Sequence, residues 1–347
     1  MRAIKKNTYP LEKCYAINTI NLRGTKHVVV AAEKEDDCIL FDLDGNFEET
    51  IWKGPSGTMS IVPLDDKKDG MFLASRKFFS PNDSMDAHIV TMTPKAEGGW
   101  NEHLLCKAQC VHRFGVLKSN GKEYLLGASI KEKHEYRDDW RFLGEMLACE
   151  LPSHPDVETC ELKPVVSGLL KNHGFTLRTQ ANGDQYAVIA CDSGVYEIHP
   201  PVEGSTEWMK VLLTEDATSD ITFADFDGDG VDEMLALAPF HGDFVRVYKK
   251  NSQGTYDKVW ESPEKHEFSH SIWAGTLQGK TFAITGHRKG ASRDLNALVY
   301  RDGSYALELL DKDCGSTNVA VYKNGDKDYL ISTNREINQV AFYELEV

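Results

Sequence analysis

The sequence predicts an all-β fold: a single seven-bladed β-propeller of four-stranded antiparallel blades that spans residues 1–347. Three observations lead to this prediction. A Gly-containing hairpin pattern occurs seven times, its period is about 50 residues, and a second series of alternating segments lies between the hairpins. Two packed β-sandwiches would explain neither the sevenfold count nor the even spacing.

Each hairpin copy places a turn glycine between two short apolar runs. Asn-Gly and Asp-Gly pairs supply the positive φ that two-residue hairpin turns need, and the flanking Val, Ile, Tyr, Phe and Thr favour strands. We therefore expect each copy to form the innermost strand of a blade, strand A, and its neighbour, strand B. The turn glycines are Gly24, Gly70, Gly121, Gly183, Gly230, Gly279 and Gly325.

The second series has the alternating pattern of half-exposed outer strands. Its six members are FEETIW, WNEHLLC, VETCELK, WMKVLLT, YDKVWES and YALELLD. No seventh member follows the last hairpin, but the N-terminal segment RAIKKNTY precedes the first hairpin at the same offset. We expect this segment to complete the last blade, which would leave no open sheet edge.

The overall composition excludes several classes of partner. A net charge of −15 argues against nucleic acids and anionic membranes. No apolar run approaches the length of a membrane span, and the N-terminus lacks the apolar region of a secretion signal. The eight cysteines form no CxxC pair, which predicts free thiols. We expect a cytoplasmic monomer or homo-oligomer that binds a small molecule.

Histidines are concentrated at two places in the repeat. In a propeller, the loop that enters strand A and the loop that leaves strand B lie on the same face near the axis. His112, His173 and His270 precede or begin strand A, and His241 and His287 follow strand B. We expect a cluster whose neutral imidazoles bind zinc, manganese or iron and keep a position open for substrate. The alternative is a water-filled channel in which histidines satisfy backbone groups.

Ionisable and aromatic residues gather on the same predicted face. Two of its loops, residues 75–88 and 131–145, are longer than their counterparts, and such loops often form lids or walls. Their aromatic and cationic side chains would suit a sugar ring, although a solvated insertion is equally compatible with the pattern. The candidates on this face are Lys77, Lys131, His134, Tyr136, Trp140, Arg288, Asn334 and Arg335.

A separate loop carries carboxylates at the spacing of an oxygen-only cation site. Its ligands would be Asp225, Asp227, Asp229, the Val231 carbonyl and Glu233. Such a donor set suits calcium, or less strongly magnesium. The loop is the A–B turn of the fifth blade, on the face opposite the histidines, so we expect a structural role.

Two resemblances follow from these motifs. The DxDGDGxxE turn within this repeat resembles FG-GAP/VCBS propellers. The segments KNHG (171–174), PFHGD (239–243), HSIWAG (270–275) and GHRKG (286–290) resemble the propeller domain of the aldos-2-ulose dehydratases, which eliminate water from keto-sugars such as 1,5-anhydrofructose at a metal-containing axial site. This resemblance implies that His173, His241, His270 and His287 hold the metal or substrate, with Arg288 beside them. Nothing in this chain corresponds to the additional cupin and lectin-like domains of the larger fungal enzymes.

The predicted function is a metal-dependent carbon–oxygen lyase for a keto-sugar or related monosaccharide derivative. Dehydration beside a carbonyl needs carbonyl polarisation, a base for the α-proton and an acid for the leaving hydroxyl. His112 or His134 would take the proton, Lys77 and Arg288 would bind hydroxyls or the oxyanion, and Lys131, Tyr136, Trp140, Asn334 and Arg335 would contact substrate. Three alternatives remain open: a propeller polysaccharide lyase, a sugar epimerase or isomerase, and a non-catalytic binding propeller.

Overall fold

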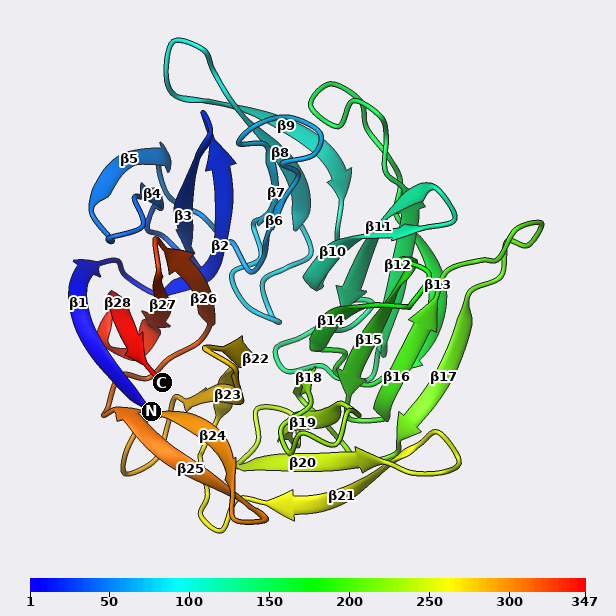
Figure 1. Ribbon diagram of the computed structural model, residues 1–347. Coiled ribbons are helices and arrows are strands. Elements are labelled where there is room, and N and C mark those ends of the chain that lie inside the picture. The colour runs from blue at the N-terminus through cyan, green and yellow to red at the C-terminus, as the bar shows by residue number, and fades with distance from the viewer.

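Seven four-stranded antiparallel sheets surround a central axis in the computed structural model, which describes residues 1–347 (Figure 1). The predicted hairpins form the two inner strands of every sheet. Arg23 and Gly24, and likewise Asn120 and Gly121, have positive φ at the A–B turns, as the twist of a two-residue hairpin requires. The predicted seven-bladed propeller is therefore confirmed.

The first four blades follow the chain in order. They contain β2 (Cys14–Leu22), β3 (Thr25–Ala32), β4 (Cys38–Phe41) and β5 (Phe47–Trp52); β6 (Ile61–Pro63), β7 (Phe72–Arg76), β8 (His88–Pro94) and β9 (Trp100–Lys107); β10 (Val111–Ser119), β11 (Lys122–Ser129), β12 (Gly144–Glu150) and β13 (Lys163–Leu169); and β14 (Gly174–Thr179), β15 (Gln185–Cys191), β16 (Gly194–His199) and β17 (Met209–Thr214).

The remaining strands complete the ring. They are β18 (Asp220–Ala224), β19 (Glu233–Ala238), β20 (Phe244–Lys250) and β21 (Tyr256–Glu261); β22 (Ser269–Leu277), β23 (Lys280–His287), β24 (Leu295–Arg301) and β25 (Ser304–Asp311); and β26 (Val319–Asn324), β27 (Lys327–Asn334) and β28 (Gln339–Glu346) with β1 (Arg2–Pro10). The only helix is the short 3₁₀ turn η1 (Arg335–Ile337), and no helix could cross a membrane.

The hydrophobic core is divided among the blade interfaces. Each of seven buried apolar clusters joins two adjacent blades, and together they close the ring. An eighth cluster lies under the long loops, near the axis and on the face where strands A begin. It consists of Tyr15, Met59, Phe78, Ala87, Cys110 and Ile130. This last cluster is apart from the sheet interfaces and borders the predicted histidine face.

The N-terminal strand completes the last blade, as the sequence predicted. β1 pairs antiparallel with β28 from Arg2 opposite Glu346 to Pro10 opposite Gln339, and Figure 1 shows the two chain ends side by side in this blade. Tyr9 also contacts Phe41 of blade one, with ring centroids 5.1 Å apart. The first strand thereby joins the last blade to the first.

One outer-strand prediction was wrong. The segment VETCELK was expected to form the outer strand of blade three, but β13 starts only at Lys163. The preceding residues instead pack on blade two, where the Cys160 amide donates to the Leu105 carbonyl at 3.0 Å and His103 Nε2 lies 2.8 Å from the Glu158 carbonyl. Pro164 is tolerated within β13 because an outermost strand has one unpaired edge.

Deleting residues 1–10 is expected to expose the edge of β28 and open the closure between blades seven and one. We expect the melting temperature to fall by roughly 5 °C or more, with association at micromolar concentration. Scanning calorimetry and size-exclusion chromatography measure both effects. Arg2→Ala, which removes only an exposed ion pair to Glu346 at 3.7 Å, is the control and should change neither. A monomeric deletion variant of unchanged stability would contradict this role of β1.

Candidate functional site

β-Bulges aim three side chains at the axis. The pairing of strands A and B shifts register between Cys14 and Ala16, between Val111 and Arg113, and between Ser269 and Ser271. A bulge inserts one residue into a strand and redirects its side chain. The three inserted residues are Tyr15, His112 and His270, which stand at the same position in blades one, three and six.

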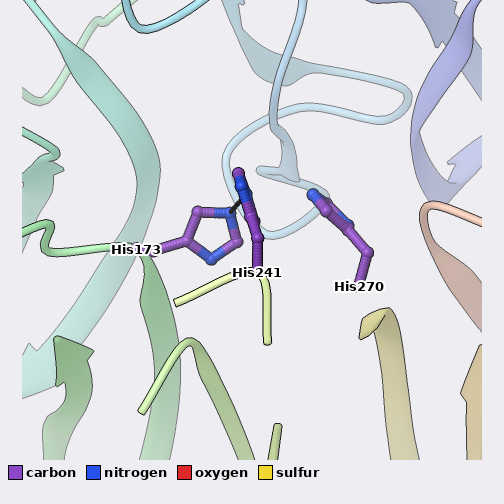
Figure 2. A group of neighbouring side chains, drawn as sticks. All are labelled: His173, His241 and His270. Atoms are coloured by element: carbon purple, nitrogen blue, oxygen red, sulfur yellow. Dashed lines mark hydrogen bonds between the residues drawn. The ribbon is translucent and has the colours of Figure 1, made fainter. Parts of the chain in front are cut away.

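His173, His241 and His270 converge beside this position (Figure 2). Their potential ligand atoms all lie within 4.8 Å of one another, and the Nε2 atoms of His173 and His241 are 3.3 Å apart. His173 Nδ1 donates to the Ser219 carbonyl at 3.0 Å, and His270 Nδ1 donates to the Thr317 carbonyl at 2.7 Å. Because a carbonyl can only accept, these bonds leave the Nε2 lone pairs of both rings available.

The ring of His241 is held between two aromatic side chains. Its centroid lies 4.0 Å from that of Phe240 and 4.2 Å from that of Phe268, and both pairs are stacked. His241 also has a left-handed backbone with φ of 47°, a conformation that non-glycine residues adopt mainly where the surroundings impose it. His241 is half-buried, whereas His173 and His270 are buried, so it forms the accessible edge of the group.

Tyr15 is a site residue that the sequence analysis missed. Its hydroxyl lies 3.2 Å from His112 Nε2 and 3.1 Å from His270 Nε2, and the side chain is buried. The signal was present in the repeat, because Tyr15 occupies in the first hairpin the position that His112 and His270 occupy in theirs. Comparing the copies by position, rather than searching for histidines, would have found it.

His112 contacts the group formed by His173, His241 and His270 but is not one of its potential metal ligands. Its ring stacks on that of His173 with centroids 4.4 Å apart, and Phe78 packs edge-on at 5.4 Å. Its Nδ1 atom is buried and has no hydrogen-bond partner in the chain. His112 therefore has one nitrogen directed at Tyr15 and a second without a partner.

Burial decides the protonation of this site. It lowers the pKa of His173 to about 3, and it holds the pKa of His112, His241 and His270 well below the ordinary 6.5. Neighbouring cations and the other imidazoles act in the same direction. Burial also raises the pKa of Tyr15 to about 12. At neutral pH the group consists of uncharged imidazoles and an intact phenol.

The two long loops cover this group. Asn82 and Asp138 join them through two hydrogen bonds of 2.8 Å. The first loop contributes Phe78, which contacts His112, and the second contributes Trp140, which lies edge-on to Phe240 at 5.6 Å. The predicted walls are thus placed above the cluster, with aromatic side chains turned inward.

Charged side chains surround the open edge near His241. Arg288 packs over the Phe268 ring at 4.6 Å and pairs with Glu336 at 2.6 Å. Arg335 bonds to the same Glu336 and to Glu33, forming a half-buried chain of alternating charges. Arg288 and Arg335 therefore lie beside the site, and both are already paired with carboxylates.

His287 was expected among the ligands, but the structure places it outside the group. The Asp294 amide donates to its Nε2 at 3.0 Å, and its Nδ1 lies 3.2 Å from the Lys289 carbonyl. Both ring nitrogens are consequently used within its own loop. The strand-B exit of blade six turns back on itself, whereas that of blade five carries His241 to the axis.

Five further candidates do not reach the cluster. Lys77 is exposed, Tyr136 is 55% exposed and packs under Arg141, and Lys131 is fully buried with Nζ donating to the Asp139 carbonyl at 2.9 Å. Asn334 is buried and bonds to Ser332 inside blade seven. His134 lies in the covering loop with Nδ1 buried and unpartnered, and it makes no hydrogen bond to the cluster. Their side chains hold the loops and the blade, or face solvent.

The acidic loop forms as predicted on the opposite face. Carboxylate oxygens of Asp225, Asp227 and Asp229 lie within 4.8 Å of one another, a group that could hold a cation. The Lys249 ammonium contacts Asp227, Asp229 at 3.0 Å and Glu233 at 3.3 Å. Lys249 would have to withdraw before a calcium or magnesium ion could take all the predicted ligands. The identity of the cation stays a prediction.

The comparisons with known proteins concern the fold. No family model and no curated protein matches the chain. Among solved structures, the β-propeller domain of Cps50 (Swd1) from Myceliophteria thermophila is similar with a TM-score of 0.60 at 10% identity, covering 98% of this chain and 99% of the other. Two structures described as glucose dehydrogenase give TM-scores of 0.53 and 0.52 at 13% and 12% identity, covering 100% of this chain and 100% and 99% of theirs. At such low identity the likeness extends to the fold alone: this chain is a β-propeller.

Proposed function

We propose that this protein is a metal-dependent carbon–oxygen lyase that acts on a small keto-sugar or a related monosaccharide derivative. The observation that carries the proposal is the convergence of three neutral imidazoles, two of them oriented by backbone carbonyls, beside a buried phenol. A catalytic metal site typically has three protein ligands and one position left for substrate or water.

The donor set fits a divalent transition metal. The 3.3 Å between the Nε2 atoms of His173 and His241 is close to the separation of two nitrogens that each lie about 2.0–2.1 Å from one tetrahedral zinc. Imidazole-only donors suit zinc, manganese or iron rather than calcium. When bound, such an ion would polarise the substrate carbonyl and make the α-proton more acidic.

Tyr15 and His112 would move the proton. With His270 Nε2 engaged by a metal, the phenol would donate its one proton to His112 Nε2, which lies 3.2 Å away. Burial keeps His112 neutral, so it could accept the phenol proton while Tyr15 takes the α-proton. The same pair can then return that proton to the departing hydroxyl, which leaves as water. One C–H bond and one C–O bond break, a carbon–carbon double bond and a water molecule form, and no oxidant is required.

Cations at the open edge would orient the sugar. Lys171 and Lys289 lie over the rings of Phe240 and Phe268, 5.2 and 4.8 Å from their centroids, on either side of His241. With Arg288 they would favour electron-rich oxygens of the substrate and the developing oxyanion. The covering loops would keep water away from the intermediate.

The alternative functions predict different reactions or a different surface around the histidines. A polysaccharide lyase or a sugar epimerase or isomerase would share the first proton transfer and differ afterwards. A non-catalytic binding propeller would present exposed aromatic patches on this face. Here Phe78 and Tyr15 are buried and Phe240 is half-buried, and Tyr136 is an exposed aromatic side chain of the covering loops. The glucose dehydrogenase neighbours are sugar enzymes by description and support only the suitability of this fold.

The test incubates the protein with 1,5-anhydrofructose in deuterated water. NMR then follows two signals: the incorporation of deuterium at the α-carbon and the appearance of a dehydrated product. We expect Tyr15→Phe to lower the rate by roughly 10²–10⁴-fold, because the proton carrier is lost, and to leave bound metal unchanged. Tyr136→Phe, at an exposed tyrosine, is the matched control and should retain full activity.

Exchange without dehydration would shift the assignment to an epimerase or isomerase. If a panel of keto-sugars showed neither exchange nor product with the metal-loaded wild type, the lyase proposal would be overturned. Full activity of Tyr15→Phe would remove Tyr15 from the mechanism and return the proton transfer to another group.

A further inference from the structure

A cavity lies on the axis below the histidines. It has a volume of about 430 Å³ and is lined by the innermost strands of the blades, from the level just beneath the histidine group toward the A–B turns. Figure 1 shows how these seven strands face one another around the axis. None of the three converging histidines lines this cavity, so it is a space separate from the proposed metal site.

Three polar side chains mark the inner end of this axial cavity. They are Arg113, Asp220 and Asn318, each one residue beyond a residue of the histidine level, namely His112, Ser219 and Thr317. An Arg113 terminal nitrogen donates to Asn318 Oδ1 at 3.0 Å and lies 3.8 Å from Asp220 Oδ2. Arg113 and Asp220 are therefore neighbours without a direct hydrogen bond.

These groups have hydrogen-bonding capacity to spare. Arg113 has five N–H donors and makes one hydrogen bond within the chain. The Asp220 carboxyl accepts from the Ile221 amide at 3.0 Å and also interacts with the Phe175 backbone, and its Oδ2 lies 3.8 Å from Arg113. Charged groups at the inner end of such a cavity are favoured by hydrogen-bonding partners, because each loses part of its contact with bulk water there. An occupant that supplies acceptors to Arg113 and donors to Asp220 would be favoured.

The charges that line the cavity limit the class of ligand that could bind there. One cation beside one anion favours an uncharged molecule, since an anion would be repelled by Asp220 and a cation by Arg113. A hydroxyl group both accepts and donates, so adjacent hydroxyls can satisfy the two side chains together. Trp273 and Phe175 provide aromatic wall for the C–H faces of a ring. The volume is within the range of small-molecule sites.

We propose that the axial cavity is a second binding site, specific for a neutral polyhydroxylated molecule of about monosaccharide size, with Arg113 and Asp220 as its polar anchors. The site depends neither on a metal nor on the histidine group. A ligand there would sit one residue layer below Tyr15 and His112, and would enter from the face of the A–B turns.

The test is calorimetric titration of the full chain, treated with chelator, with D-glucose, D-fructose, D-glucuronate and L-serine as probes. We expect saturable binding of at least one neutral sugar, and weaker or no binding of the sugar acid and the amino acid. Arg113→Gln and Asp220→Asn should each weaken the binding by at least about tenfold, because each leaves hydroxyls without a charged partner.

Two further variants keep the test decisive if a polar substitution disturbs folding. Thr222→Phe fills the cavity from its wall without changing either anchor, and should abolish binding while the protein keeps its melting temperature. Thr179→Phe places the same side chain at an exposed position near the end of β14, outside the cavity, and should bind normally.

His241→Ala separates this proposal from the lyase assignment. It should leave sugar binding to the chelated protein unchanged even if the lyase proposal fails. Binding that is lost in His241→Ala but retained in Thr222→Phe would place the ligand at the histidines and overturn the second site. Preferential binding of glucuronate or serine would overturn the ligand class, and no saturable binding of any probe would overturn the site itself.

Discussion

The double variant His241→Ala/His270→Ala should lose its transition metal completely, from about one equivalent per chain in the wild type to none. Removing two of three imidazole ligands leaves His173 alone, and a single imidazole cannot retain the ion through purification. Even changes in groups that merely orient ligands typically cost 10–100-fold in affinity or activity, so we expect turnover to fall by at least about a hundredfold. Elemental mass spectrometry of the purified proteins measures the metal directly.

His287→Ala is the matched control for this experiment. Its ring is bonded at both nitrogens to backbone groups of its own loop, so the variant should keep the metal and most of the activity. Retention of the metal by the double variant would contradict the three-histidine site. Calcium as the only metal, unchanged by the substitutions, would overturn the metal-dependent mechanism and favour metal-free acid–base chemistry or a binding propeller.

The metal-free protein should lose stability steeply as the pH falls below 6.5. Burial lowers the pKa of His173 to about 3 and that of His112, His241 and His270 well below 6.5, so the unfolded chain binds more protons than the folded chain. The stability is fully present above pH 6.5 and is lost progressively below it. For each such imidazole, the free energy of unfolding falls by about 1.4 kcal/mol per pH unit.

One buried carboxyl opposes this trend. Burial raises the pKa of Asp220 to about 6, above the ordinary 3.8, so between these values the folded chain holds this proton more tightly and gains stability as the pH falls. The four histidines of the site against one aspartate leave a net loss of roughly 4 kcal/mol between pH 6 and pH 5. Urea unfolding of the chelated protein at pH 7, 6 and 5 measures the slope.

Two variants test whether these histidines and Asp220 cause the change of stability with pH. His270→Ala should flatten the slope by about 1.4 kcal/mol per pH unit, and Asp220→Asn should steepen it by a similar amount below pH 6. Replacing the exposed Tyr136 by Phe should leave it unchanged. A stability that does not vary between pH 7 and pH 5 in the chelated wild type would show that the histidines are not held neutral by burial.

Local patterns were sufficient to predict the propeller. The turn glycines, the alternating outer segments and the offset of RAIKKNTY encode short-range hairpins whose register follows from turn geometry, and their sevenfold count sets the closure. VETCELK failed because its alternation also suits a segment that packs on the outer strand of the neighbouring blade. Periodicity alone does not distinguish these two partners.

The sequence by itself determined the seven blades, the strand that closes them, and the face on which the histidines lie, because each depends on patterns within one repeat. Only the tertiary structure decided which side chains meet. Bulges turn Tyr15, His112 and His270 to the axis, and the exit of blade five brings His241 to the group while that of blade six keeps His287 bonded to its own loop. The contacts among the side chains at the axis join blades about 50 residues or more apart in the chain, and no local pattern records them.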